Sequence, residues 1–142
     1  MLSAFPAVFF KEELGYTVVF PDLNYLSTCG DTEEEALSMA VDCLAGYLYN
    51  ANLDGEIIPR PSSPASLDIA TLAQELEVDS EGSFVNVVTV DVQEYAKKHF
   101  EKAVKKTLTI PAWMNERAME MGINFSQTLQ EALLSKIRTQ GK

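Results

Sequence analysis

Residues 105–111 read Lys-Lys-Thr-Leu-Thr-Ile-Pro, so polar and aliphatic side chains alternate up to a proline. In a β-strand, such alternation separates two faces. One face carries Lys105, Thr107 and Thr109, and the other carries Lys106, Leu108 and Ile110. A single strand this short neither pairs its own backbone groups nor buries two aliphatic side chains. The pattern therefore predicts an antiparallel ribbon formed with the same strand of a second chain.

Two amphipathic helices are expected after this strand. Pro111 suits a first helical position and Gly122 suits a left-handed C-cap, which places the first helix between them. Asn124 is expected to cap the second helix, whose apolar side carries Phe125, Leu129, Ala132, Leu133 and Ile137. The segment from Lys105 to Ile137 is too short to fold alone, so two copies related by a two-fold axis are expected to share a dimer core. The predicted dimer-core residues are Leu108, Ile110, Met114, Leu129 and Leu133.

This ribbon-helix-helix pattern predicts DNA binding, because a two-stranded ribbon fits the major groove. The polar face is expected to meet base edges, and the start of the second helix offers backbone amides to a phosphate. The predicted DNA-binding residues are Lys105, Lys106, Thr107, Thr109, Asn124, Phe125 and Ser126. Trp113 is expected to pack or to contact the second chain. A tail that only forms dimers is the alternative.

The charge of the chain is divided unevenly along its length. The 142 residues carry a formal net charge of −10. Residues 1–103 hold 5 Lys and Arg against 18 Asp and Glu, whereas residues 104–142 hold 6 against 3. The two parts therefore carry −13 and +3, which predicts a basic DNA-binding piece and an acidic body suited to a basic protein. Ordinary solvation of an acidic domain is the alternative for the body.

The N-terminal part predicts an antiparallel sheet. Strands are expected at Phe5–Phe10 and Tyr16–Phe20, joined by a polar link that ends in Gly15. A third strand is expected at Tyr25–Cys29, and a fourth in the valine-rich stretch Ser83–Asp91. The first three strands are expected to lie side by side.

Helix signals alternate with these strands. Thr32 begins a capping box and is followed by apolar residues at helical spacing. Residues 56–82 contain three prolines and predict a loop with a short helix near Thr71–Leu76. Asp91 is expected to cap another helix, whose apolar stripe runs to Ala103.

These elements predict an α+β fold in two parts. Residues 1–103 are expected to form a sheet-and-helix domain with a core of its own. Residues 104–142 are expected to form the ribbon-helix-helix domain for dimerisation and DNA binding.

Several stretches resemble the HicB antitoxin family of toxin–antitoxin operons. In the N-terminal part they are Pro6–Phe9, Gly15–Leu23, Gly30–Thr32 with Glu35–Ala36, and Ile58–Ser62. In the C-terminal part they are Leu108–Ala118 and Gly122–Gln127, which are similar to that family's ribbon-helix-helix version. The resemblance covers nearly the whole chain.

The resemblance implies a partial ribonuclease-H-like N-terminal domain that lacks the enzymatic activity of that fold. It also implies that this domain binds and neutralises HicA, a small basic toxin that cleaves RNA and has a catalytic histidine. The tail would act as a transcription repressor of the operon encoding both proteins, which is autoregulation. A homodimer through the tail and a higher hetero-oligomer with the toxin are then expected. Other family members carry a helix-turn-helix tail, so the DNA-binding prediction here depends on the tail residues.

The expected toxin contacts lie on the sheet and first helix, where aromatic and acidic side chains suit a basic partner. They are Asp22, Tyr25, Asp31, Glu33, Glu34 and Tyr47. Core packing explains each tyrosine equally well, and a favourable helix N-terminus explains the acidic run.

No catalytic, metal or cofactor site is predicted. The carboxylates that a ribonuclease-H-like metal site would need are explained as turn and cap residues: Asp22, Asp31, Glu35 and Asp91. His99 is the only histidine, and it has no recognisable nucleophile motif near it. It is expected to be packed or solvated.

Cys29 and Cys43 are expected to be buried, reduced thiols of a cytoplasmic protein, because no secretory segment precedes them. No apolar run approaches the roughly 20 residues of a membrane-spanning helix, so no membrane association is expected. The alternative function is a free-standing ribbon-helix-helix repressor whose acidic domain senses a ligand or forms oligomers. A neighbouring reading frame for a small basic protein with a histidine would favour the antitoxin.

Overall fold

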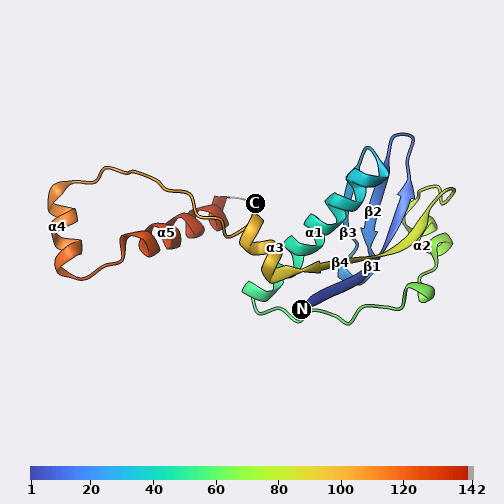
Figure 1. The fold of residues 1–142 in the computed structure, drawn as a ribbon, viewed down its shortest axis with the longest axis horizontal. Helices are drawn as coiled ribbons and strands as arrows, with labels where there is room; N and C mark the ends of the chain where they lie inside the picture. Colours follow the sequence, from blue (N-terminus) through green and yellow to red (C-terminus); the bar gives the residue numbers. More distant parts are fainter. Residues whose placement is uncertain (141–142) are drawn as a thin grey trace. The chain divides into compact units, whose positions relative to one another are not determined.

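The chain folds into two compact units in a computed structural model that describes residues 1–140 (Figure 1). The first unit is Met1–Ala103, and the second begins at Val104. The strands of the first unit are β1 (Leu2–Lys11), β2 (Tyr16–Phe20), β3 (Leu26–Gly30) and β4 (Phe84–Asp91). Its helices are α1 (Glu33–Leu53), α2 (Ile69–Leu76) and α3 (Val92–His99), with the short 3-10 helices η1 (Pro21–Leu23) and η2 (Pro64–Ser66). The second unit contains α4 (Ala112–Glu120) and α5 (Phe125–Gln140).

The four strands form one antiparallel sheet in the order β3-β2-β1-β4. The hairpin of β1 and β2 confirms the predicted connection. Its Gly15 has a φ of +82°, and a side chain there would collide with the backbone of Gly30. β4 pairs with β1 along the register from Leu2↔Asp91 to Phe9↔Phe84. The first and last strands of the unit are therefore neighbours, and β2 and β4 flank β1.

One face of the sheet is covered by α1 (Figure 1). Thr32 begins this helix, because its Oγ1 accepts a hydrogen bond from the amide of Glu35 at 3.0 Å, which confirms the predicted cap. The buried residues of α1 recur at helical spacing: Ala36, Ala40, Leu44, Ala45, Leu48 and Ala51. In the same core, Phe9 and Phe84 stack with ring centroids 5.0 Å apart. The main core therefore lies between α1 and alternate residues of the strands.

The opposite face carries a smaller core, which involves α2. Leu72 and Ala73 of this helix pack with Val8, Phe10 and Val19 of the sheet. The predicted short helix is therefore present, but it begins at Ile69. Asp68, the preceding residue, caps this helix, because its carboxylate accepts a hydrogen bond from the amide of Thr71 at 3.3 Å. The helix therefore starts before Thr71, where it was predicted to start.

α3 is shorter than its apolar stripe predicts. Asp91 caps it as expected, since its carboxylate accepts a hydrogen bond from a backbone amide at 3.2 Å. The helix nevertheless ends at His99, so the prediction that it reaches Ala103 is wrong. The next residue, Phe100, turns onto Tyr49 of α1, with ring centroids 5.3 Å apart. Phe100 is thus the C-cap of α3, and its ring packs on another helix instead of continuing the apolar stripe.

The two helices of the second unit are joined at Gly122. This residue has a φ of +68°, and the amide of Ile123 donates to the carbonyl of Ala118 at 3.0 Å, which confirms the left-handed cap. Pro111 is the N-cap of α4, one position before the first helical residue that it was expected to be. None of the helices within residues 1–140 is long and apolar enough to span a bilayer.

The stretch from residue 102 to 111 carries no regular secondary structure. The strand predicted at residues 105–110 is therefore not formed by a single chain. A β-strand requires hydrogen bonds to a neighbouring strand, and the described residues provide none for this stretch. A paired strand here stays a prediction for two chains.

Candidate functional site

Asp22, in η1, is bonded to the proline-rich loop. Its Oδ2 accepts a hydrogen bond from the amide of Ser62 at 2.7 Å, and its Oδ1 accepts one from the Ser62 hydroxyl at 2.6 Å. The pair is partly buried, and it joins two of the stretches that resemble the HicB family. Asp22 was predicted as a partner contact. Because both of its oxygens serve the loop, we assign it to positioning that loop.

Replacing Asp22 by asparagine is expected to lower the free energy of unfolding by about 1.5–3 kcal/mol, the usual contribution of a hydrogen bond to a charged group. The asparagine amide would place a donor against one of the two Ser62 donors. Ser62→Ala keeps the backbone donor and should cost about 1 kcal/mol. Ser63→Ala is the control and should stay within about 0.5 kcal/mol, since its side chain makes no cap bond. Urea unfolding measures all three, and wild-type stability of Asp22→Asn would contradict the assignment.

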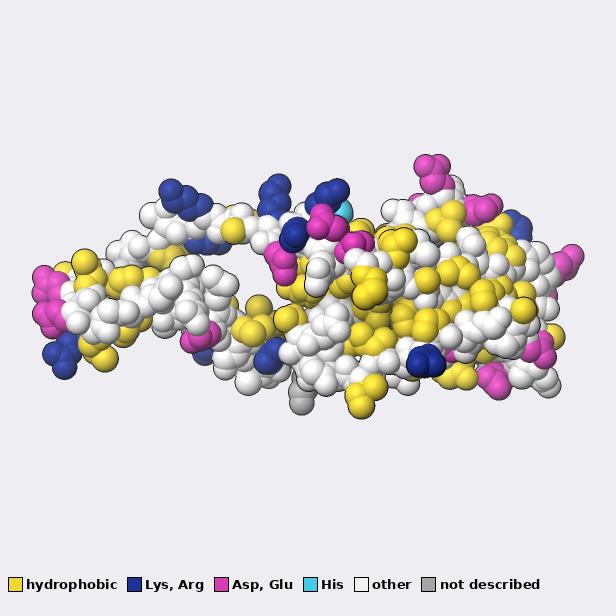
Figure 2. All heavy atoms as spheres, turned by 60° about the horizontal axis from the view of Figure 1, so that its bottom comes forward, with side chains coloured by type: hydrophobic (Ala, Val, Ile, Leu, Met, Phe, Trp, Pro, Cys, Tyr) yellow, Lys and Arg dark blue, Asp and Glu magenta, His cyan; other side chains and the backbone are white. Residues whose placement is uncertain are grey.

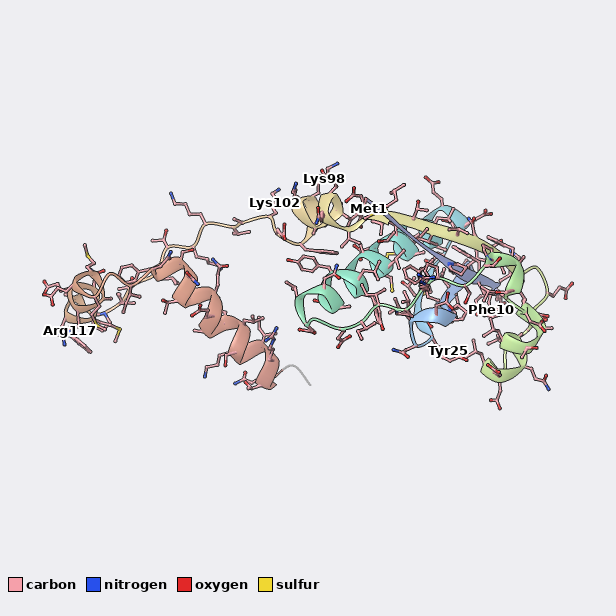
Figure 3. The ribbon with its side chains drawn as sticks, turned by 90° about the horizontal axis from the view of Figure 1, so that it is seen from below. Met1, Phe10, Tyr25, Lys98, Lys102 and Arg117 are labelled. Atoms are coloured by element: carbon pink, nitrogen blue, oxygen red, sulfur yellow. The ribbon has the colours of Figure 1, made fainter. Side chains whose placement is uncertain are left out.

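An exposed tyrosine is held in an unusual turn between η1 and β3. Asn24 and Tyr25 have φ values of +57° and +59°, which aromatic residues rarely adopt. Asn24 Nδ2 donates a hydrogen bond to Tyr47 Oη at 3.2 Å, and Tyr25 Oη donates one to Glu75 Oε2 at 3.3 Å. Tyr25 still has 48% of its surface exposed (Figure 3). Strained residues cluster at functional sites, so these four residues, the tyrosine turn, are the strongest candidate contact of the first unit.

The acidic candidates lie at the other end of β3. Asp31, Glu33 and Glu34 follow this strand at the exposed start of α1, whereas Tyr25 precedes it. The strand has 5 residues. At about 3.3 Å per residue it separates the two groups by roughly 17 Å. Tyr47 is joined to Asn24 of the tyrosine turn. The structure places the three carboxylates, the acidic helix start, in a separate patch.

Three of the residues that shape this region were not found from the sequence. Ser62 belongs to a stretch that resembles the HicB family, so its importance had a signal, but its pairing with Asp22 did not. Asn24 was treated only as a turn residue. Glu75 carries no local signal, because its contact with Tyr25 joins residues that are distant in the sequence.

The predicted DNA-binding residues occupy two places, and all of them are exposed in the single chain. The first group precedes α4: Lys105, Lys106, Thr107 and Thr109. The second group is at the start of α5: Asn124, Phe125 and Ser126. There, Asn124 Oδ1 accepts a hydrogen bond from the amide of Gln127 at 3.0 Å, which confirms the expected helix cap.

The described part of the second unit contains no buried side chain. Within the predicted dimer core, the exposed fractions are 61% for Leu108, 42% for Ile110, 42% for Met114 and 52% for Leu133, and Leu129 is half-buried. Trp113 is also 67% exposed. Soluble monomers rarely expose so many large apolar side chains together. A further apolar surface is needed to complete this unit.

An aromatic cluster lies where α3 meets α1. The ring of Tyr95 stacks on His99 with centroids 4.1 Å apart, and His99 stays exposed, so the predicted packed or solvated histidine stacks on a ring while facing solvent. The Tyr95 hydroxyl donates a hydrogen bond to Asp42 Oδ1 at 2.9 Å. Burial and this carboxylate raise the pKa of Tyr95, so the phenol stays a proton donor. The cluster fixes α3 on α1.

The carboxylates considered for a metal site have separate structural roles. Asp22 holds the loop, and Asp91 caps α3. Hydrogen bonds from the amide of Glu94 and from the amino-terminal group lower the pKa of Asp91. Within residues 1–140, no three His, Cys, Asp or Glu side chains are grouped to hold a metal ion.

Both cysteines are free, but only one is shielded from solvent. Cys43 is half-buried on α1, and burial, followed by the neighbouring Asp42, raises the pKa of its thiol. Cys29 is exposed, so the prediction that both thiols are buried is wrong. Alternation along β3 turns Cys29 away from the core face on which Leu26 packs.

Two comparisons with known proteins cover these features. Residues 4–72 match the HicB-like antitoxins of bacterial toxin–antitoxin systems. A chain in the solved structure of a toxin–antitoxin complex from Streptococcus pneumoniae is 35% identical to this one, with a TM-score of 0.66. That similarity covers 96% of this chain and 99% of the other, so it extends through both units. The chain belongs to the HicB-like antitoxin family.

Curated relatives of this HicB-like antitoxin match over a shorter length. Antitoxin HicB 2 of Photorhabdus laumondii subsp. laumondii is 42% identical over 59 residues, which are 42% of this chain and 42% of that protein. Antitoxin HicB 1 of the same organism is 50% identical over 50 residues, which are 35% of this chain and 32% of that protein. The alignment therefore spans less than half of each relative.

Proposed function

We propose that this HicB-like antitoxin neutralises a small, basic, RNA-cleaving toxin of the HicA type and represses its own operon. Residues 1–103 bind the toxin, and residues 104–142 form a ribbon-helix-helix dimer on operator DNA. The observation that carries the proposal is the 35% identity, over nearly the whole chain, to a chain of a toxin–antitoxin complex. On this proposal the first unit is a partial ribonuclease-H-like fold that acts by binding and not by catalysis.

The charge of the first unit supports a basic partner. Its 5 basic residues face 18 acidic ones, and Figure 2 shows acidic side chains on its outer parts. Opposite charge accelerates the encounter of two proteins, and the same charge disfavours binding of RNA or DNA to this unit. The tyrosine turn then offers an aromatic anchor for the toxin, and the acidic helix start steers its approach.

The exposed apolar side chains support dimerisation of the second unit. In the proposed dimer, residues 105–110 of two chains pair as a ribbon, and each backbone gains the hydrogen bonds that a single chain lacks. Leu108 and Ile110 then face the helices, where they meet Met114, Leu129 and Leu133 of both copies. A two-fold axis makes this interface self-complementary and closed.

Replacing Thr107 by alanine is expected to weaken discrimination between the operator and a mutated operator. The loss should be somewhat below the roughly 1–3 kcal/mol of a good bidentate base contact, because the threonine faces the groove with a single hydroxyl. Thr139→Ala, in the last turn of α5, is the matched control. Fluorescence anisotropy with both DNAs measures the ratio of affinities. A Thr107→Ala protein that loses its dimer would place this residue in the core and reverse the two faces.

Co-expression with the protein encoded next to this chain tests the toxin partnership. We expect a small basic protein to co-purify with the antitoxin, in a complex whose mass by light scattering exceeds that of the antitoxin dimer. If the chain purifies alone as a DNA-binding dimer, it is a free-standing repressor and the toxin assignment is wrong.

A further inference from the structure

Positive charge is concentrated where α3 ends and the second unit begins. Residues 97–106 hold five of the 11 Lys and Arg residues and a single acidic residue, a formal charge of +4. Residues 1–96 hold only Lys11 and Arg60 against 17 acidic residues, a formal charge of −15. Figure 2 shows dark-blue side chains near the cyan histidine of α3, with acidic side chains among them. We call the five basic residues the lysine segment: Lys97, Lys98, Lys102, Lys105 and Lys106.

The lysines at the end of α3 are accessible. Lys98 and Lys102 are exposed, and Figure 3 shows both at the surface of this end. Within the described residues neither of them forms an ion pair. Lys97 pairs with Glu94 at 3.3 Å, but their side chains are 67% and 63% exposed. An ion pair this exposed contributes little to stability, so it competes weakly with an anionic partner.

The single carboxylate of this segment is hydrogen-bonded to α1. Glu101 Oε2 accepts a hydrogen bond from Tyr49 Oη at 3.2 Å, and its amide donates to the carbonyl of Ala96 at 2.7 Å. The neighbouring Phe100 packs against Tyr49 and Tyr95, with ring centroids 5.3 and 5.6 Å apart. These contacts hold the chain on α1 as far as Glu101. Lys97 and Lys98 are therefore carried by a fixed support, and Lys102 follows it directly.

Chain connectivity keeps these lysines close to the proposed ribbon. Lys102 precedes Lys105 by three residues, so their Cα atoms are at most about 11 Å apart. Lys105 and Lys106 belong to the stretch that is proposed to enter the major groove. DNA held by the ribbon at Lys105 would therefore lie near Lys102 as well.

We propose that the lysine segment binds the phosphate backbone of DNA beside the ribbon, so that α3 of the toxin-binding unit takes part in DNA binding. This inference rests on the proposed DNA-binding function of the second unit. The rest of the first unit is acidic and repels DNA, so its basic end is the part that can lie close to DNA. Phosphate contacts add affinity without reading sequence. The lysines therefore supply binding strength and register, and the threonines supply specificity.

The test uses the full chain with three substitutions, Lys97→Gln, Lys98→Gln and Lys102→Gln. The matched control carries Lys11→Gln and Arg60→Gln, which removes the other two basic residues of the first unit. Affinity for operator DNA is measured between about 50 and 200 mM salt. In the triple variant we expect the slope of log affinity against log salt to fall by about 0.9 per lost phosphate contact. The ratio of operator to random DNA should not change, and the control should keep the wild-type slope.

Each other outcome overturns the inference in a recognisable way. Wild-type affinity and slope in the triple variant, with folding verified by circular dichroism, overturn the inference and leave the proposed function intact. An equal loss in the control variant shows that only net charge matters. A wild-type chain that binds no DNA overturns the inference and the DNA-binding function together. Binding to phosphatidylcholine–phosphatidylglycerol vesicles that the triple variant loses, with unchanged DNA affinity, assigns the segment to a membrane surface instead.

Discussion

Replacing Leu108 by alanine is expected to dissociate the proposed dimer of the second unit and to abolish its proposed DNA binding as a consequence. Leu108 is 61% exposed in the single chain, so its burial depends entirely on a second copy. Truncation of a large aliphatic core residue costs about 2–5 kcal/mol, and a two-fold dimer loses two such side chains. The first unit keeps its fold, because its two cores contain no residue of the second unit.

Sedimentation velocity over a range of concentrations measures this effect, with DNA affinity recorded in parallel. The matched control is Met119→Ala, an equally exposed apolar residue of α4 outside the proposed dimer core, at 64% exposure. The control should remain dimeric and bind DNA. A dimeric Leu108→Ala protein with altered base preference would show that the strand presents its other face to the groove.

Truncation after Ala103 is the second change with a large expected effect. The fragment should be folded and monomeric, and it should have no measurable affinity for operator DNA. The reason is that the first unit contains both cores, while the exposed apolar residues and the proposed ribbon are removed. Thermal unfolding, light scattering and anisotropy check the three expectations. Retention of the dimer by the fragment would place the dimer contact in the first unit.

The local elements of the fold could be predicted from the sequence, since turns, caps and alternation act over a few residues. Gly15, Thr32 and Asn124 each mark a turn or helix start that the structure confirms. The place of β4 could not be predicted. It pairs with β1, which is at the other end of the unit in sequence, and nothing in a valine-rich sequence specifies which strand it pairs with. The end of α3 was missed as well, because Phe100 caps the helix and packs on Tyr49, a residue distant in the sequence.

The same contrast between local features and tertiary contacts holds for the candidate site. The exposed tyrosine and the acidic helix start were predicted as residues, but not their separation into two patches along β3. The clamp of Asp22 and Ser62 joins two segments whose proximity depends on tertiary structure. The proposed ribbon requires strand pairing with a second chain, so it cannot form in the structure of a single chain. The clustering of lysines at residues 97–106 was visible in the sequence, but a count by halves of the chain concealed it.

Neutralisation of the toxin by residues 1–103 alone is the central claim, and the rate of RNA cleavage by the purified toxin tests it most directly. Added in equimolar amount, the fragment is expected to stop cleavage as completely as the full chain does. Its association rate should fall as salt is raised, because the attraction between the acidic unit and a basic toxin is screened over about 8–10 Å near physiological ionic strength. Undiminished cleavage in the presence of the folded fragment, with inhibition by the full chain or by the second unit alone, would contradict the assignment of toxin binding to the first unit.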